Sequence, residues 1–237
     1  MKRVFVLSIC FLFIICGCVF VFKKESNSLI DETIVKEVNN NINIELDLEY
    51  PKLYPLYFNN NFGYHNTSER TSKIEYIVIH YTGEEKDAKD FVDFFNDPTS
   101  VYASADYFVG FNGDIYKYNL EVEKRYSWAV GGNIITDKPT NGGAYQGIVT
   151  NDNSISIEMS AYSGGSIEAN EPGWSLSEDT IDSTVYLTRY LMEVYNIPVE
   201  NVVRHYDVTG KWCPGVIGWN DNTINSNKWE EFKDRLV

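Results

Sequence analysis

The chain has 237 residues, of which 43% are apolar and 15% are aromatic. This apolar content is sufficient for a hydrophobic core, so a wholly disordered chain is excluded. The formal net charge is −14, and so acidic a chain is not expected to bind nucleic acid.

The first 24 residues have the pattern of an export signal or a membrane anchor. Two basic residues precede Val4–Phe22, a run of 19 residues without a charged side chain, and two lysines follow it. A helix of this length, at about 1.5 Å per residue, nearly spans the ~30 Å hydrocarbon layer of a membrane. We expect an extracytoplasmic protein anchored to the cell membrane, either by a transmembrane helix or as a lipoprotein through a lipid-modified Cys18. Secretion after removal of a signal peptide is the alternative.

Cys213 is the single cysteine outside this leader, because the other three cysteines lie within residues 1–24. A disulfide framework is therefore excluded for the rest of the chain. The remaining choices for Cys213 are a buried inert thiol, a reactive thiol and a metal ligand. Without the four basic residues of the leader, the chain carries 16 basic and 34 acidic side chains, which is a net charge of −18.

We divide the chain into a leader at 1–24, a tether and lead-in at 25–72, and a single domain at 73–237. The tether and lead-in are rich in Asn, Ser and Glu, and such a composition is typical of a segment that does not build a core of its own. His65 lies in this segment in a polar setting. We expect it to be an exposed loop residue.

Strands and helices alternate from residue 74 onward. Residues 74–82 are a β-branched and aromatic run that predicts a central strand, and residues 84–95 show helical spacing. Residues 106–119 place two aromatic runs around an Asn-Gly pair, which predicts an antiparallel hairpin. Residues 153–162 alternate as in a strand, with Glu158 on the face opposite the apolar residues.

The second half of the domain continues the alternation. A long helix is expected at 178–196, with Ser175 and Glu178 forming a capping box at its start. A strand at 201–206 and a short closing helix at 227–236 follow. This order, with at least one antiparallel pair, predicts an α/β fold in which α-helices flank a mixed central β-sheet.

Three residues suggest a metal site. His80 and His205 lie at the carboxyl ends of two predicted strands, and such ends meet at one edge of an open sheet. Cys213 follows His205 by eight residues, and Gly210 between them allows the chain to reverse. Two imidazoles and one thiolate leave the fourth position of tetrahedral Zn²⁺ open, as in catalytic zinc sites.

Five motifs carry a family resemblance: IVIHYTG, ASADYFVGFNGDIY, SWAVGG, NSISIEM and VVRHYDVTGKWCPG. In this order, between about Ile74 and Trp219, they resemble the zinc-dependent N-acetylmuramoyl-L-alanine amidases of type 2, which are related to peptidoglycan-recognition proteins and phage endolysins. The resemblance implies one catalytic domain of that type. It also implies that His80, His205 and Cys213 hold Zn²⁺.

The same resemblance implies a reaction and a role for each site residue. The reaction is hydrolysis of the amide bond between N-acetylmuramic acid and L-alanine in bacterial peptidoglycan, in cell-wall remodelling or lysis. Glu158 is expected to transfer the proton and Lys211 to stabilise the negative charge of the tetrahedral intermediate. The aromatic residues expected to contact the substrate are Tyr107, Trp128 and Trp212, with Tyr145 and Trp174 as further candidates. We expect a monomer whose partners are peptidoglycan and, through the leader, the membrane.

Two positions depart from the pattern of this family. Asp106 and Ala129 stand where the family commonly has histidine, and both are expected beside the cleft. Neither is an assigned metal ligand, so metal binding is expected to survive while turnover or substrate preference changes. These departures motivate an alternative function, a peptidoglycan-binding module without catalysis. A cytoplasmic enzyme that recycles muropeptides would share the site but conflicts with the leader.

Overall fold

The structure is a computed structural model that describes residues 54–100, 102–131, 142–220 and 227–237. All of these belong to one compact unit, Tyr50–Val237. The leader with Cys18 and most of the tether lie outside the described residues, so their predicted roles stay predictions. Within the described part of the chain, no helix combines the length and apolar character needed to cross a bilayer.

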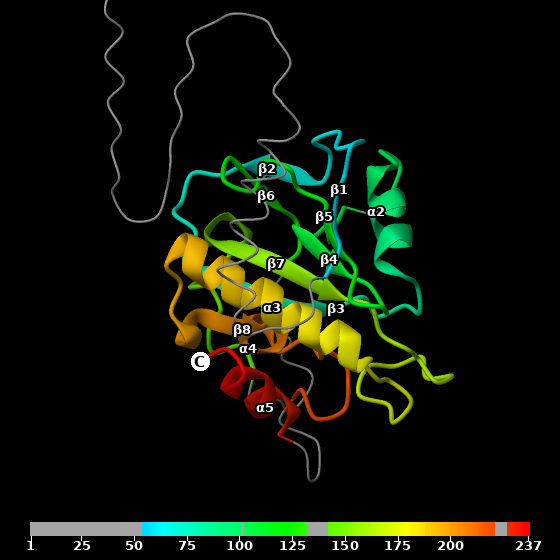
Figure 1. Cartoon of the computed structure of the whole chain (residues 1–237). Coiled ribbons are helices and arrows are strands. Elements are labelled where there is room, and N and C mark those ends of the chain that lie inside the picture. Colours follow the sequence, from blue (N-terminus) through cyan, green and yellow to red (C-terminus); the bar gives the residue numbers. More distant parts are fainter. Residues whose placement is uncertain (1–53, 101, 132–141, 221–226) are drawn as a thin grey trace, which may run out of the picture. The chain divides into compact units, whose positions relative to one another are not determined.

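A six-stranded sheet forms the centre of the domain, in the order β1-β5-β4-β7-β3-β8 (Figure 1). The strands are β1 (Leu56–Phe58), β3 (Tyr76–Tyr81), β4 (Tyr107–Val109), β5 (Ile115–Lys117), β7 (Ser154–Met159) and β8 (Val202–Arg204). The pair β4–β5 is antiparallel, as the predicted hairpin requires, and the other pairs are parallel. Two more strands, β2 (Thr67–Glu69) and β6 (Arg125–Ser127), form a separate antiparallel ribbon.

Helices cover both faces of this sheet. The described residues include α2 (Ala88–Asn96), α3 (Glu178–Tyr195), α4 (His205–Thr209) and α5 (Lys228–Asp234), with 3₁₀ turns η1 (Asn151–Asn153) and η2 (Val199–Asn201). In Figure 1, α3 runs across the sheet over β7 and β3. Strand β4 sends Tyr107 and Val109 into the core beneath α3 and Phe108 into the core beneath α2. The predicted α/β fold with a mixed central sheet is confirmed.

The two faces of β7 differ as the alternation predicts. Ile155, Ile157 and Met159 pack into the core beneath α3, and Glu158 lies on the other face. That second face is also largely buried, because Ser156 is only 2% exposed. Burial on both faces is what parallel strands in the middle of an α/β sheet require.

The start of α3 differs from the prediction by two residues. Ser177, and not Ser175, caps the helix, because its Oγ accepts a hydrogen bond of 3.0 Å from the main-chain N–H of Thr180. Ser175 instead pairs with Tyr162 in an isolated β-bridge. The helix ends at Asn196, which has the left-handed φ of 53° that a C-cap often needs.

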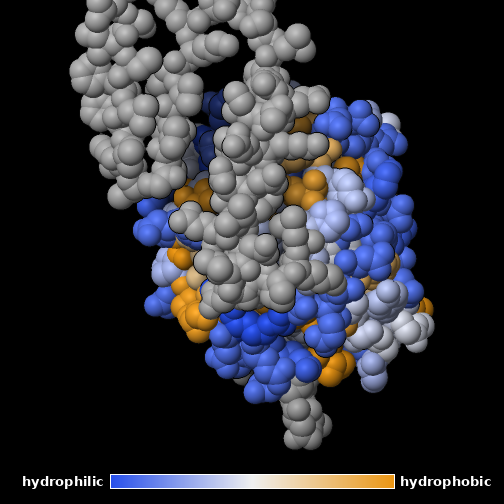
Figure 2. Space-filling view, viewed as in Figure 1, coloured by the Kyte–Doolittle hydropathy of each residue, from blue (hydrophilic) through white to orange (hydrophobic). Residues whose placement is uncertain are grey.

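The lead-in segment takes part in the fold. It supplies β1, which joins the main sheet, and β2, which joins the ribbon. His65, expected to be exposed, is half-buried, and its Nε2 lies 2.8 Å from the carbonyl oxygen of Phe95. The domain boundary at residue 73 and the monomeric state stay predictions. Figure 2 shows a largely hydrophilic surface with separate hydrophobic patches, as the acidic composition leads one to expect.

A buried carboxylate ties β4, β6 and β7 together. Oδ1 of Asp106 accepts hydrogen bonds of 2.8 Å from Asn119 Nδ2 and from Ser127 Oγ, and its Oδ2 accepts one of 2.9 Å from the main-chain N–H of Ser156. We call these four residues the Asp106 hub. Asp106 is 1% exposed, and its predicted place beside a cleft stays a prediction. The hub is part of the structural core.

Candidate metal centre and active site

Strands β3 and β7 bring His80 and Glu158 side by side. The two residues are partners in the parallel register, and Nδ1 of His80 lies 3.9 Å from Oε1 of Glu158. His80 is 1% exposed, whereas the side chain of Glu158 is 20% exposed. The side chain of Glu158 is therefore partly accessible beside the buried imidazole.

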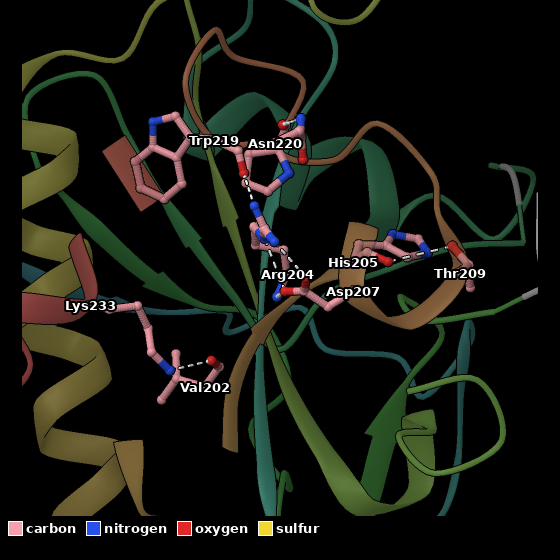
Figure 3. Close-up of polar contacts among 9 residues, drawn as sticks. Val202, Arg204, His205, Asp207, Thr209, Trp219, Asn220 and Lys233 are labelled. Carbon is pink, nitrogen blue, oxygen red and sulfur yellow. Dashed lines mark hydrogen bonds and ion pairs between the residues drawn. The ribbon is translucent and has the colours of Figure 1, made fainter. Parts of the chain in front are cut away.

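His205 reaches the same place from a helix. The sequence predicts that His205 ends a strand. In the structure, strand β8 ends at Arg204 and His205 is the first residue of α4. The turn is held by Asp207, whose carboxylate accepts hydrogen bonds from the main-chain N–H of Arg204 at 2.7 Å and from its guanidinium at 2.9 and 2.6 Å. Arg204 also donates to the carbonyl of Trp219, and Figure 3 shows the guanidinium between these two acceptors. This fork fixes the position at which His205 leaves the sheet.

The chain then reverses to bring Cys213 back to the two histidines. Gly210 ends α4 with a φ of 79°, a conformation that favours glycine, so the predicted reversal is confirmed. The carbonyl of Cys213 accepts a hydrogen bond of 2.9 Å from the main-chain N–H of Tyr206, which is in the first turn of α4. Cys213 is 2% exposed.

Three ligand atoms converge at this point. The Nδ1 atoms of His80 and His205 are 3.1 Å apart, and Sγ of Cys213 lies 3.7 Å from Nδ1 of His80. All three atoms lie within 4.8 Å of one another. Nitrogen and sulfur ligands around tetrahedral zinc are separated by about 3.3–3.6 Å, given bond lengths of about 2.0–2.3 Å. The structure therefore brings the three predicted ligands within one coordination sphere.

The electrostatics of the site also suit a bound cation. Burial lowers the pKa of His205 to about 3 and the pKa of His80 well below its usual value, so both imidazoles are neutral and offer lone pairs. Burial raises the pKa of Cys213 to about 12. A bound divalent ion reverses this effect, because a coordinating thiol is deprotonated. The donor set of two imidazole nitrogens and one sulfur fits zinc or a similar transition metal.

Three atoms of the site are buried without a hydrogen-bond partner among the described residues. They are Nε2 of His80, Nε2 of His205 and Oε2 of Glu158. Burial raises the pKa of Glu158 to about 8, and the charge of Lys211 opposes this shift. Buried polar atoms normally find partners. The unpaired carboxylate oxygen is therefore available to a water or substrate group that enters the site.

Lys211 lies close enough for its charge to act on every group of the site. It lowers the pKa of His80, of His205 and of Glu158. Its own side chain is exposed. A cation in this place faces an incoming substrate rather than the protein core.

The predicted substrate-contacting aromatics fall into two groups. Tyr107 is 4% exposed and packs in the core beneath α3, so the structure does not support its contact with a substrate. Trp174 is 3% exposed and packs edge-on against Tyr81. Trp128 and Trp212 are half-buried; the ring of Trp212 stacks on Tyr206 at 5.3 Å. These two tryptophans retain ring surface for a ligand, as does the half-buried Tyr145.

Asn151 is a positioning residue that the sequence analysis did not single out. Its Oδ1 accepts hydrogen bonds from the main-chain N–H groups of Ala129 at 3.1 Å and Val130 at 2.6 Å. The backbone of the next residue, Gly131, lies close enough to His205 to act on its pKa. Asn151 therefore holds the segment of Ala129 and Val130 close to the site. The sequence gives no signal for this role, because Asn151 is one of several asparagines in the surrounding stretch.

The fold and site together define the class of protein. The profile of a family described as N-acetylmuramoyl-L-alanine amidase matches residues 70–216, more than half of the chain. The chain belongs to the N-acetylmuramoyl-L-alanine amidase family. The predicted family is thus confirmed.

Particular relatives show the same relationship. N-acetylmuramoyl-L-alanine amidase BlyA of Bacillus subtilis (strain 168) is 28% identical over 169 residues, which are 69% of this chain and 41% of that protein. This chain thus spans less than half the length of that curated relative.

Solved structures share the fold. The structure of PlyL is 22% identical with a TM-score of 0.54, covering 78% of this chain and 97% of PlyL. The solution structure of the PlyG catalytic domain is 26% identical with a TM-score of 0.53, covering 76% of this chain and 92% of that domain.

Proposed function

We propose that this chain is a zinc-dependent hydrolase that cleaves the amide bond between N-acetylmuramic acid and L-alanine in peptidoglycan. The observation that carries the proposal is the convergence of His80, His205 and Cys213 beside the partly exposed side chain of Glu158. Membership of the amidase family supplies the bond type. The donor set supports zinc as the ion.

When bound, a zinc ion supplies Lewis-acid activation of the scissile carbonyl and of water. His80 and His205 would hold it through Nδ1, and Cys213 through Sγ. The fork of Arg204 and Asp207 keeps His205 in place for this task.

Glu158 handles the proton in this proposal. Its carboxylate accepts a proton from the attacking water and returns it to the nitrogen of L-alanine as the amide bond breaks. Burial favours the protonated form of Glu158, which suits the second of these steps. The unpaired Oε2 is the atom placed to exchange the proton.

Lys211 stabilises the negative charge that develops on the carbonyl oxygen. Its positive charge already acts on Glu158 and both histidines, and its exposed side chain can follow a bound substrate. Trp128 and Trp212 are proposed to contact the glycan or stem peptide through their accessible ring surface.

Digestion of purified sacculi tests the proposal. The full chain should release stem peptides with a free N-terminal L-alanine, detected by mass spectrometry, and a chelator should stop the release until zinc is restored. Binding to sacculi without release of fragments would favour the alternative, a peptidoglycan-binding module. The complete ligand and Glu158 set argues against that alternative.

We also propose that the enzyme works outside the cytoplasm and is tethered to the membrane by its leader. The support is the uncharged run Val4–Phe22 between basic flanks. Fractionation of cells that produce the full chain, with palmitate labelling of Cys18 variants, separates a helix anchor from a lipid anchor and from secretion.

A further inference from the structure

The segment that carries Cys213 is held at three consecutive carbonyl groups, those of residues 213–215. The first carbonyl accepts a hydrogen bond of 2.9 Å from the main-chain N–H of Tyr206. The second accepts one of 2.6 Å from Nδ2 of Asn220, and the third accepts one of 2.8 Å from the main-chain N–H of Asn170. Asn220 is the one donor of the three that acts through its side chain.

The same segment packs closely against β3. A Cβ atom on Gly215 would collide with the ring and the hydroxyl of Tyr81. Tyr81 directly follows His80 in β3. Contact with β3 therefore limits how far the segment can move toward the strand that carries the first histidine.

Asn220 is also joined to the segment that carries His205. The carbonyl of the preceding residue, Trp219, accepts a hydrogen bond from the guanidinium of Arg204, the neighbour of His205 in the sequence. Figure 3 shows the guanidinium directed at this carbonyl, with Asn220 next to it. The pair Trp219–Asn220 therefore contacts both segments that carry a candidate ligand, one through a main-chain carbonyl and the other through a carboxamide.

The carboxamide of Asn220 is itself held in place. Asn220 is 3% exposed, and its Nδ2 also donates a hydrogen bond of 3.0 Å to Oδ1 of Asn170. Breaking either bond would leave a buried polar atom without a partner, which is costly. The side chain is therefore a fixed support for the carbonyl of Pro214.

We propose that Asn220 is a positioning residue of the metal centre, which holds the segment of Cys213 in register with His205. The inference rests on the proposed metal centre, and Asn220 acts through Pro214 rather than as a ligand. Without this support the segment gains conformational freedom, and that freedom must be lost each time an ion binds. Loss of a supporting residue around a metal typically lowers metal affinity 10–100-fold.

Asn59 offers a matched control. It follows β1, at the edge of the main sheet opposite β8. Asn59 is 4% exposed, and its Nδ2 donates to Oδ1 of Asn96 at 2.8 Å and to the carbonyl of Tyr118 at 3.3 Å. Asn59 and Asn220 thus share the same burial and the same two kinds of acceptor, and N59D and N220D replace the same donor by an oxygen.

Zinc titration in competition with a chromophoric chelator tests the inference on the full chain in detergent, at a temperature where circular dichroism shows each variant to be folded. N220D and N220A should weaken zinc binding at least ten-fold relative to wild type. N59D and N59A should change it less than two-fold, although both pairs of variants should lower the thermal midpoint. With cobalt as the probe, the charge-transfer absorption of the sulfur–cobalt bond should be weaker per bound ion in N220D and unchanged in N59D.

A measurement on wild type applies even where the Asn220 variants do not fold. Exchange of the side-chain amide protons of Asn220 and Asn59 is followed by NMR with and without zinc. Zinc should slow exchange at Asn220 at least five-fold, because the ion fixes the segment that this carboxamide supports. Exchange at Asn59 should not change.

Three results overturn the inference. They are zinc affinity of the wild-type level in N220D and N220A, an equal loss in N59D, and exchange at Asn220 that zinc does not alter. Failure of wild type to bind zinc or cobalt overturns the proposed metal centre, and the inference with it. The two failures are distinguishable, because a wild type that binds zinc and releases stem peptides keeps the proposed function whatever the variants show.

Discussion

Two buried polar clusters lie on the same sheet and differ in how their atoms are satisfied. In the Asp106 hub, the carboxylate accepts three hydrogen bonds from Asn119, Ser127 and Ser156. In the cluster of candidate metal ligands, the close contacts join the ring nitrogens of His80 and His205 and the sulfur of Cys213 to one another. Oε2 of the neighbouring Glu158 has no partner among the described residues.

This difference separates a structural cluster from a functional one. A buried polar group that is fully paired stabilises the fold around it. A cluster of converging lone pairs in a buried place is costly unless something else occupies it. The hub is complete as it stands, whereas the cluster of His80, His205 and Cys213 has the arrangement of a group that could hold a metal ion. Substitutions in the two clusters should therefore affect different properties.

The largest effect is expected from C213S. Loss of the thiolate removes one of three candidate ligands and should abolish stem-peptide release, a far larger effect than the 10–100-fold typical for loss of a supporting residue around a metal. The thermal unfolding of the metal-free protein should change little, because serine replaces a buried thiol of similar size. Release assays on sacculi and circular dichroism measure the two quantities. Wild-type turnover in C213S would contradict the metal mechanism.

The second-largest effect is expected from E158Q. Its kcat should fall roughly 10²–10⁴-fold, as expected for loss of a general acid–base group. Its zinc content should match that of wild type, because Glu158 is not a ligand in this account. E75Q removes an exposed carboxylate immediately before β3 and is the matched control. Loss of zinc in E158Q would show instead that Glu158 holds the metal.

A smaller fall, of roughly 10²–10³-fold in kcat, is expected for K211M, because one stabiliser of the oxyanion is removed. The side chain is exposed, so the free energy of unfolding should change by less than about 0.5 kcal/mol. K73M, at another exposed lysine, should leave kcat unchanged. An equal loss in both variants would point to general surface charge rather than a site residue.

The hub is tested by D106A, which should lower the free energy of unfolding by about 3–5 kcal/mol. Three buried donors lose their acceptor, and each such loss costs about 1–3 kcal/mol. Zinc content of the folded fraction should stay at the wild-type level. The control D93A breaks an exposed pair with Lys89 and should cost at most about 1 kcal/mol. Urea titration measures both, and a small effect of D106A would remove the contrast between the clusters.

Much of this fold could be predicted from local pattern. The Asn112–Gly113 hairpin, the central strands and the long helix α3 follow from periodicity and turn chemistry, because those signals act over a few residues. The three candidate metal ligands could be named because their residue types and positions near predicted strand ends restrict the chemistry. The structure adds their convergence.

Other features depend on contacts between distant segments and could not be predicted in this way. In the sequence, Asp106 is interpreted as a position beside the cleft that departs from the family pattern. In the structure, its carboxylate accepts hydrogen bonds from the N–H of Ser156, 50 residues away, and from the side chains of Asn119 and Ser127. The sequence analysis expects Tyr107 to contact the substrate. Strand alternation instead directs its side chain into the core beneath α3. His205 begins a helix because Asp207 accepts from Arg204, a contact that propensity does not reveal.

Zinc binding tests the central claim most directly. The full-length protein, stripped of metal and titrated in competition with a chromophoric chelator, should take up one zinc ion per chain. C213S and H205A should lose this tight binding, whereas D106A should retain it in its folded fraction. Absence of zinc uptake by wild type, or undiminished uptake by a C213S/H205A double variant, would contradict the account.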